Sequence, residues 1–334
     1  MRILKSVIAA ESLAEIAAKQ YDLALPVRSR LLSVNDNDTY LIDSGNVEWR
    51  GARHVLRVYR YRKHWIDNPA NYRFELDWLV HLHDQGHPVS YPIARRNGEL
   101  LGVLHAPEGE RYYALFSFAP GKIFWPMSVE QCHLFGADMA RIHQASNTFQ
   151  TLHPRGHQNL EWILDRPVGR IEAFLGDRRP EDLVFLQDLV TSIKQSAGSL
   201  PHSAPFYGII GGDFHGGNHF ITDDNMFTYF DFDLCGYGWR AYDLAVYWWS
   251  TKRSSASPEL WQAALEGYES VRPLIEEERQ ALPALVNARQ IWLMGSHTDY
   301  IDSGGDEWLG DRYWDSNFGY LKQWVKNEGS PLTE

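Results

Sequence analysis

The feature that most constrains the fold is the stretch GGDFHGGNHFITDDNMFTYFDFD, residues 211–233. Two short apolar and aromatic runs, HFIT and FTYF, flank the polar residues DDNM, which is the pattern of a β-hairpin. We expect a two-residue turn at Asp224-Asn225, which would place Asn218 directly opposite Asp231. An amide and a carboxylate would then meet at the open end of the hairpin. Because an unpaired buried carboxylate is costly, this pairing favours a bound ligand there.

Asn218 and Asp231 would supply hard oxygen ligands of the kind that Mg²⁺ prefers. This ion typically takes one or two protein groups and completes its shell with water and substrate phosphates. Asp213, on a Gly-rich loop before Asn218, would face the same ion without binding it, in the position of a general base. The structural alternative is that the hairpin is only a turn and Asp213 only a loop cap. Three polar groups around one hairpin favour the metal-assisted site.

Length, charge and cysteine content narrow the class of protein. The chain has 334 residues and a formal net charge of −11, so we expect one large bilobal unit or two domains. Its acidic charge argues against a nonspecific nucleic-acid partner, since phosphate binding requires a basic surface. Cys132 and Cys235 are the only cysteines, and no credible secretion signal is present, which is typical of a reducing, cytoplasmic location. No run approaches the roughly 18 apolar residues of a membrane span, so no membrane partner is expected.

Apolar periodicity divides the chain into a strand-rich part and a helix-rich part. Period-two alternation over 29–61 predicts an antiparallel sheet, which a helix and two further strands follow. Helices then dominate, and Ser128 and Gln131 fit a capping box at the start of one of them. We therefore expect an α+β fold with a small antiparallel-sheet N-lobe, residues 1–120, and a larger, mostly helical C-lobe, residues 121–334.

The order GDFHGGNHF, YFDFD and GYGWRAYDLA resembles the catalytic region of the aminoglycoside phosphotransferase and choline kinase family, a relative of the eukaryotic protein kinases. The resemblance implies a bilobal protein-kinase-like fold, ATP and Mg²⁺ as cofactors, and a hydroxyl acceptor. It implies that Asp213 is the catalytic base and that Asn218 and Asp231 are the metal ligands. Gly211 stands where the family usually has His, which removes a loop-bracing side chain. For Asp243, a bracing or capping role is favoured over direct chemistry.

The resemblance extends to the N-lobe, where it implies a nucleotide site. HVLRVY is similar to the strand whose basic residue holds the α- and β-phosphates, which assigns this role to Arg57. A guanidinium in place of the Lys of protein kinases still binds phosphate through two donors. Glu75, on the following helix, is similar to the acid that pairs with this base. The alternatives are a strand-surface charge and a solvated helix acid.

Two further segments match the order of nucleotide-binding elements. Residues 33–41, SVNDNDTYL, occupy the position of the nucleotide-covering loop, and Asn37 and Thr39 would offer donors to the phosphates. The alternative is a plain polar turn. The run LFSFAPG resembles the hinge, in which the backbone groups of Ser117 and Phe118 would read adenine.

The acceptor is the least constrained part of the prediction. RQIWLMGSHTDYID and DEWLGDRYW resemble the bacterial stress-response kinase branch, close to type II homoserine kinases. We favour a small-molecule acceptor, with a protein Ser or Thr as the alternative and a catalytically silent nucleotide-binding regulator as a third hypothesis. Acidic residues among tryptophans in this segment would suit a cationic acceptor, or else they face solvent. These acids are Asp299, Asp302, Asp306, Glu307, Asp311 and Asp315.

Overall fold

The computed structural model describes residues 3–45, 51–63, 65–66, 68–301 and 305–327. The chain forms two compact units, which we call the N-lobe and the C-lobe. The N-lobe comprises Met1–Lys122, Phe149–Arg155 and His219–Phe230. The C-lobe comprises Ile123–Thr148, Gly156–Asn218 and Asp231–Glu334. An α+β fold with an antiparallel sheet in the first part and mainly helices in the second confirms the expected fold class.

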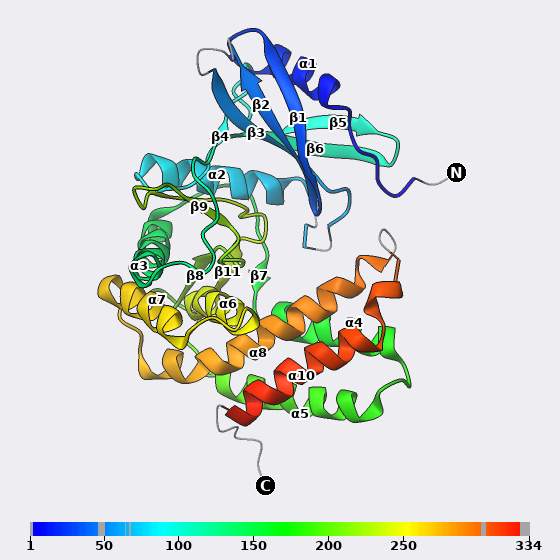
Figure 1. Ribbon diagram of the computed structural model, residues 1–334, viewed down its shortest axis with the longest axis vertical. Helices are drawn as coiled ribbons and strands as arrows, with labels where there is room; N and C mark the ends of the chain where they lie inside the picture. The colour runs from blue at the N-terminus through cyan, green and yellow to red at the C-terminus, as the bar shows by residue number, and fades with distance from the viewer. Residues whose placement is uncertain (1–2, 46–50, 64, 67, 302–304, 328–334) are drawn as a thin grey trace. The chain divides into compact units, whose positions relative to one another are not determined.

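The N-lobe is built on a six-stranded antiparallel sheet with the order β1-β2-β3-β6-β4, and β5 also pairs with β6 (Figure 1). Its strands are β1 (Val27–Val34), β2 (Asn37–Ser44), β3 (Ala52–Tyr59), β4 (Pro92–Ile93), β5 (Gly102–Ala106) and β6 (Gly109–Ser117). Its helices are α1 (Ala10–Gln20) and α2 (Ala70–Asp84). The predicted sheet over 29–61 is therefore present, as three strands.

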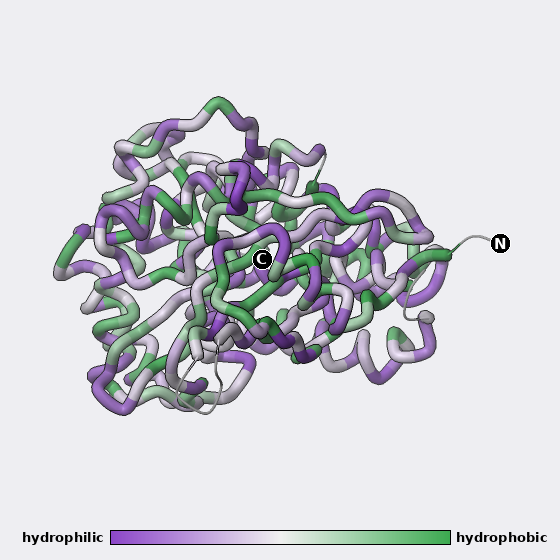
Figure 2. The backbone as a smooth tube through the Cα atoms, turned by 90° about the horizontal axis from the view of Figure 1, so that it is seen from above, coloured by the Kyte–Doolittle hydropathy of each residue, from purple (hydrophilic) through white to green (hydrophobic). Residues whose placement is uncertain are grey.

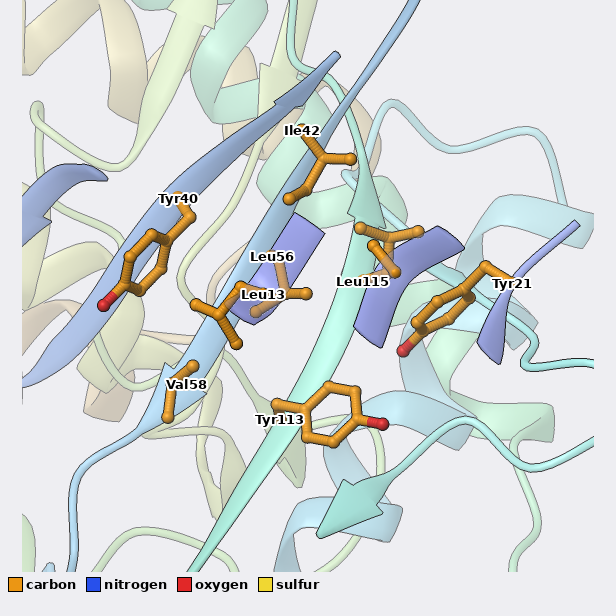
Figure 3. Close-up of a cluster of buried hydrophobic side chains, with 9 residues drawn as sticks. Leu13, Tyr21, Tyr40, Ile42, Leu56, Val58, Tyr113 and Leu115 are labelled. Carbon is orange, nitrogen blue, oxygen red and sulfur yellow. The ribbon is translucent and has the colours of Figure 1, made fainter. Parts of the chain in front are cut away.

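The alternation of side chains gives this sheet one face that packs with α1 and an opposite face on which apolar and polar residues are mixed. Tyr40, Ile42, Leu56 and Leu115 point to one side, where they pack with Leu13 of α1 in the buried cluster of Figure 3. Residues one position along each strand point to the opposite side. That second face carries Arg57, the predicted phosphate-binding residue, so the apolar core beneath the sheet fixes where Arg57 lies.

A short hairpin of β9 (His219–Ile221) and β10 (Phe227–Tyr229) also belongs to the N-lobe. The expected hairpin is present, but the predicted two-residue turn was wrong. The amide of Asn225 donates to the carbonyl of Thr222, and the amide of Thr222 donates to the carbonyl of Met226. Asn225 takes the left-handed conformation, with φ of 59°. This is a three-residue loop that ends in a left-handed residue. It shifts the register by one, so that His219 rather than Phe220 pairs with Tyr229.

Helices form most of the C-lobe. Its α-helices are α3 (Val129–Ala145), α4 (Arg166–Leu175), α5 (Pro180–Ala197), α6 (Arg240–Arg253), α7 (Pro258–Val271), α8 (Glu276–Thr298) and α10 (Asp311–Asn327). A small sheet has the order β7-β11-β8 and is formed by β7 (His157–Gln158), β8 (Tyr207–Ile210) and β11 (Gly236–Trp239). Helix α8 packs against α6 and α4, which Figure 1 shows beside it. The predicted capping box at Ser128 and Gln131 is confirmed at the start of α3.

Helices α3 and α7 approach each other backbone to backbone. A Cβ on Gly136 of α3 would lie 1.8 Å from the carbonyl oxygen of Ala264, and one on Gly267 of α7 would lie 1.9 Å from that of His133. Real Cβ contacts are never this short, so each helix needs a glycine where it meets the other. The two glycines thereby set the spacing of the helices that carry His143 and Tyr268.

Hydrophobic and hydrophilic residues alternate over short stretches of the backbone (Figure 2). Within the described part of the chain, no helix is both long enough and apolar enough to cross a membrane.

Candidate active site

The loop between β8 and β9 holds Asp213 in a dense set of hydrogen bonds. Nδ2 of Asn218 donates to the carbonyl oxygen of Asp213 at 3.0 Å and to its Oδ2 at 3.1 Å. Nδ1 of His215 accepts from the amide of Gly217 at 2.9 Å, which places the ring proton on Nε2. That nitrogen lies 3.5 Å from Oδ2 of Asp213. The carboxylate is thus oriented by its own loop before any ligand binds.

The start of this loop is anchored by one buried carboxylate on α6. Oδ1 of Asp243 accepts the amide of Gly212, and Oδ2 accepts the amide of Gly211, both at 2.8 Å. Asp243 is fully buried, so its three hydrogen bonds, counting one from His143, replace the water it has lost. The loop-bracing role expected for Asp243 is therefore present in the structure.

His143 on α3 supports Asp243 from behind. Its Nε2 lies 2.9 Å from Oδ2 of Asp243, and its Nδ1 lies 2.9 Å from the hydroxyl of Tyr268. A carboxylate accepts only, so Nε2 carries the proton and Nδ1 accepts from the tyrosine. Burial lowers the pKa of His143 to about 4 even though Asp243 opposes the shift, which keeps the ring neutral. The sequence signal for this residue was a histidine on the apolar face of a helix.

Phe214 explains why glycine fits at position 211. A Cβ there would lie 2.5 Å from the ring of Phe214, whose edge packs against Phe232 with centroids 5.5 Å apart. A larger side chain at 211 would displace this aromatic cluster. With glycine at this position, the start of the loop is held by Asp243, which His143 supports.

Sequence reasoning missed Arg289, on α8, as a contact of the predicted base. Its Nη2 donates to Oδ1 of Asp213, and its side chain is only 4% exposed. The guanidinium lies over two indole rings, with Cζ 4.5 Å from the centroid of Trp292 and 5.1 Å from that of Trp249. The sequence feature that could have indicated Arg289 is its position as a charged residue inside the apolar helical run ALVNARQIWLM. Asp213 therefore has a cation and an amide on its two oxygens.

The two predicted metal ligands lie at the same end of the β9–β10 ladder. Asn218 directly precedes His219, and Asp231 follows two residues after Tyr229, the partner of His219. The register places Phe230, not Asp231, opposite Asn218, so the predicted direct pairing was wrong. Asp231 has a φ of 67°, a strained conformation for a residue other than glycine and one that is concentrated at functional sites.

These residues suit an ion that accepts few protein ligands. Because Nδ2 of Asn218 faces Asp213, its amide oxygen lies on the other side and can serve as a ligand. Among the described residues, no group of three or more His, Cys, Asp or Glu could hold a metal. An amide oxygen and a carboxylate are the donor set of Mg²⁺, which keeps waters and phosphate oxygens in its shell.

On the face of the N-lobe sheet opposite α1, the expected ion pair is present. Nη1 of Arg57 lies 3.0 Å from Oε1 of Glu75, which is fully buried in α2. Oε2 of Glu75 accepts the hydroxyl of Tyr59 at 3.2 Å. Thr39 pairs with Arg57 and Asn37 with Tyr59 across β2 and β3, so all four point to the same face.

Two details of the predicted nucleotide segments differ from expectation. Asn37 and Thr39 lie within β2 rather than in a loop, and the turn before them contains only Asn35 and Asp36. At the predicted hinge, the amide of Ser117 donates to the carbonyl of Tyr91, and its carbonyl accepts the hydroxyl of Ser90. These backbone groups of Ser117 are engaged within the N-lobe, whereas the ring of Phe118 lies 4.0 Å from the guanidinium of Arg53.

A pocket of about 350 Å³ in the C-lobe adjoins the loop of Asp213. Its walls include Trp125, His215, Trp249, Ser250 and Arg253. Among the described residues that line it, none is Asp or Glu. His215 and Trp249 link the pocket to the base, since His215 faces Asp213 and Trp249 contacts Arg289.

The acidic residues of the C-terminal segment lie elsewhere. Asp299 lies 3.0 Å from Arg170, and Asp311 and Asp315 both contact Arg179. Asp306 and Glu307 are exposed, and Asp302 lies outside the described residues. Trp292 and Trp314 are buried, while Trp308 is exposed. The acids that the structure describes therefore form ion pairs with arginines or face solvent, and the structure does not bring them to Asp213.

Comparison with known proteins identifies chains of similar sequence and structure. A protein of Deinococcus radiodurans is 35% identical over 333 residues, covering 98% of this chain and 93% of its own length. The homoserine kinase of Sinorhizobium medicae is 31% identical over 247 residues, covering 71% of this chain and 69% of its own. Among solved structures, a microcompartment-associated aminopropanol kinase has a TM-score of 0.76 at 22% identity, covering 97% of this chain and 100% of that one.

An amicoumacin kinase solved with AMP-PNP and Ca²⁺ has the same TM-score of 0.76 at 19% identity, covering 98% of this chain and 95% of that one. At these identities the structural likeness shows the fold, which is that of the kinase-like phosphotransferases. The model of the phosphotransferase enzyme family matches residues 28–274. Because this match covers most of the chain, the chain belongs to the phosphotransferase enzyme family and is a phosphotransferase of the kinase type.

Proposed function

We propose that this protein transfers the γ-phosphoryl group of ATP to a hydroxyl group of a small-molecule acceptor, with Mg²⁺ as the metal. The observation that carries the proposal is the fixed orientation of Asp213, which Asn218 and Arg289 hold by its two carboxylate oxygens. In the reaction, the acceptor oxygen forms a bond to the γ-phosphorus, and the bond from that phosphorus to the β-bridging oxygen breaks. The hydroxyl proton passes to Asp213, the proposed base.

Residues of the N-lobe are proposed to bind the nucleotide. Arg57 would hold the α- and β-phosphates, since its ion pair with buried Glu75 fixes the guanidinium in place. Thr39 and Asn37 lie on the same face and would contribute polar contacts. Because the amide and carbonyl of Ser117 are already engaged, reading of the adenine base would depend mainly on Phe118.

Asn218 and Asp231 are proposed to hold Mg²⁺ through an amide oxygen and a carboxylate. When bound, the ion neutralises charge that develops on the phosphate oxygens. Support comes from the hard-oxygen donor set and from the strained backbone of Asp231, with φ of 67°.

A small molecule is proposed as the acceptor because the pocket beside Asp213 has a volume of about 350 Å³, which is the size range of small-ligand sites. The similar homoserine kinase is named for a small hydroxylated amino acid, and the similar aminopropanol kinase is named for a small amino alcohol. A protein Ser or Thr acceptor and a silent nucleotide-binding regulator are the competing hypotheses.

The experiment is a screen with radiolabelled ATP against hydroxylated amino acids, amino alcohols, aminoglycosides and generic protein acceptors. We expect label to appear in a small molecule. Labelled polypeptide would favour the protein-kinase alternative, and nucleotide binding without turnover on any acceptor would favour the regulator.

The matched variants for this screen are Asp213→Asn and Asp188→Asn, the latter an exposed acid on α5. We expect Asp213→Asn to lower kcat by about 10² to 10⁴ while ATP affinity is retained. Asp188→Asn should behave like the parent. If Asp213→Asn turned over at a near-native rate, Asp213 would not be the catalytic base.

A further inference from the structure

Strand β1 lies at an edge of the N-lobe sheet and turns a row of backbone groups away from it. The amide of Gly45 donates to the carbonyl of Pro26 at 3.0 Å, so this carbonyl points towards β2. The direction of the backbone groups alternates along an antiparallel strand. The N–H and C=O groups of Val27, Ser29 and Leu31 therefore point away from β2, where no strand of the described part of the chain pairs with them. A further strand can pair with such a row.

A groove of about 890 Å³ lies beside this edge. One wall is the segment 25–29. The other wall is one face of α1, which packs against β1 (Figure 1) and presents Glu11, Ala14, Glu15 and Ala18. Because the two alanines carry only methyl groups, a segment that paired with β1 would have space for its side chains beside the helix.

The two faces of this edge carry opposite charges. Glu11 and Glu15 are exposed on α1, and neither forms an ion pair with another described residue. Arg28 and Arg30 are also exposed. They point to the face opposite α1, because Ser29 between them pairs with a core residue of β2. A strand added at β1 would thus meet carboxylates on one face and guanidinium groups on the other.

A second copy of β1 does not suit this edge. In an antiparallel two-fold pairing centred on Ser29, Arg28 of one copy would lie opposite Arg30 of the other. Centring the pairing on either arginine would place that residue opposite itself. Like charges directly opposite each other are destabilising. The β-bulge that follows Leu31 also ends the regular edge, so a short segment of different sequence fits better.

We infer that the edge of β1 and the groove beside it form a docking site for an extended segment of a partner protein in which basic and acidic side chains alternate. The backbone of this segment would continue the N-lobe sheet. Its basic side chains would lie near Glu11 and Glu15, and its acidic side chains would lie near Arg28 and Arg30. The site contains none of the residues proposed to bind ATP or the acceptor, so the inference goes beyond the proposed function and does not depend on it.

A synthetic peptide with a fluorescent label is the probe. It contains three lysines that alternate with two glutamates, and a valine at each end. The control peptide has the same composition, with the lysines adjacent to one another, so that its charges do not separate onto two faces. In fluorescence anisotropy at low salt with the full chain, we expect the Kd of the probe to be about tenfold lower than that of the control. This is the combined contribution of several exposed charge pairs.

Variants of α1 test the contact with the basic side chains. The double variant Glu11→Gln and Glu15→Gln should weaken binding of the probe about fivefold and leave phosphoryl transfer unchanged. Glu259→Gln, which removes an exposed acid from α7, is the matched control and should bind the probe like the parent. Thermal melting checks that each variant is folded.

Methylated peptides and hydrogen exchange test the backbone pairing. Methyl groups are placed on the lysine amides of one probe and on the glutamate amides of another. Because alternate amides of a strand point to opposite edges, one methylated probe should lose binding and the other should retain it. In the complex, exchange at the amides of Val27, Ser29 and Leu31 should slow, whereas the amides of Arg28 and Arg30 should change little because they already face β2.

Several outcomes would overturn the docking site. These are equal affinity for the probe and the control peptide, undetectable binding of both, and full affinity for the probe in the double variant. Binding that survives both methylations, or that both abolish, would contradict pairing at a single edge. A protein that transfers no phosphoryl group but binds the probe as expected would contradict the proposed function and still support the docking site.

Discussion

Replacing Asp243 by Asn should weaken the loop of the proposed base without changing the size of the side chain. The carboxylate uses one oxygen for the amide of Gly212 and the other for the amide of Gly211 and for His143. An Asn side chain has a single accepting oxygen. In either orientation of the amide, the N–H of Gly211 or of Gly212 faces an NH₂ group and loses its acceptor.

The expected loss of stability in Asp243→Asn follows from the number of hydrogen bonds that the substitution removes or weakens. One buried donor without an acceptor costs about 1–3 kcal/mol, and hydrogen bonds to a neutral oxygen are weaker than those to a carboxylate. We expect the free energy of unfolding to fall by about 2–4 kcal/mol. Because the same loop carries Asp213, a shift of its backbone should lower kcat by about 10²-fold with little change in nucleotide affinity.

Hydrogen exchange provides the local assay and urea denaturation the global one. In the parent, the amides of Gly211 and Gly212 should exchange slowly, and in Asp243→Asn at least one should exchange much faster. Tyr268→Phe is the matched control, since its hydroxyl donates to His143 and accepts from Nη1 of Arg272 but does not contact the loop. This variant should destabilise the protein by about 1–3 kcal/mol and leave the exchange of both glycine amides slow. Unchanged exchange at both glycines together with native kcat in Asp243→Asn would refute the bracing role.

Three further predictions concern the metal, the nucleotide and pH. Asp231→Ala should raise the Mg²⁺ concentration for half-maximal activity more than Asn218→Ala does, since only the former removes a charged ligand; equal titration curves for both variants and the parent would exclude a shared ion. Glu75→Gln should raise KM for ATP about tenfold by releasing Arg57, and an unchanged KM would place the phosphates elsewhere. The pKa of His143 is about 4 in the folded chain against an ordinary 6.5, so the stability that its neutral form provides is complete above pH 6.5 and is lost as the pH falls towards 4, by on the order of 3 kcal/mol. Thermal melts should show a smaller acid-induced loss for His143→Gln, and an equal loss would contradict this.

Local patterns predicted the elements of the fold well. The Ser128 and Gln131 capping box needs only residues three apart and is present at α3. Alternation over 29–61 predicted the sheet because the sheet has one apolar face. The predicted hairpin register was wrong because the turn also includes Asp223, with the left-handed Asn225 as its last residue. A one-residue change in the turn moves every pair of the ladder.

Contacts between distant parts of the sequence account for what could not be predicted in the site. Asp213 and Arg289 are 76 residues apart, and His143 and Asp243 are 100 apart. No periodicity or spacing relates such residues, since only the packing of α3, α6 and α8 brings them together. The motif therefore predicted the ordered loop of Asp213 and Asn218, but not the groups that hold Asp213 from outside it.

Where α3 and α7 cross, Gly136 and Gly267 each have a hydrogen atom in the place of a side chain. The proposed active site depends on both, although neither glycine lies in it. If Gly136 or Gly267 acquired a methyl group, the helices would have to separate, and the contact between His143 and Tyr268, one residue carried by each helix, would stretch with them. The disturbance would then pass through Asp243 to the loop of the proposed base. A mutation at Gly136 or Gly267 could thus inactivate the protein. All residues proposed to contact ATP or the acceptor would be unchanged in such a variant.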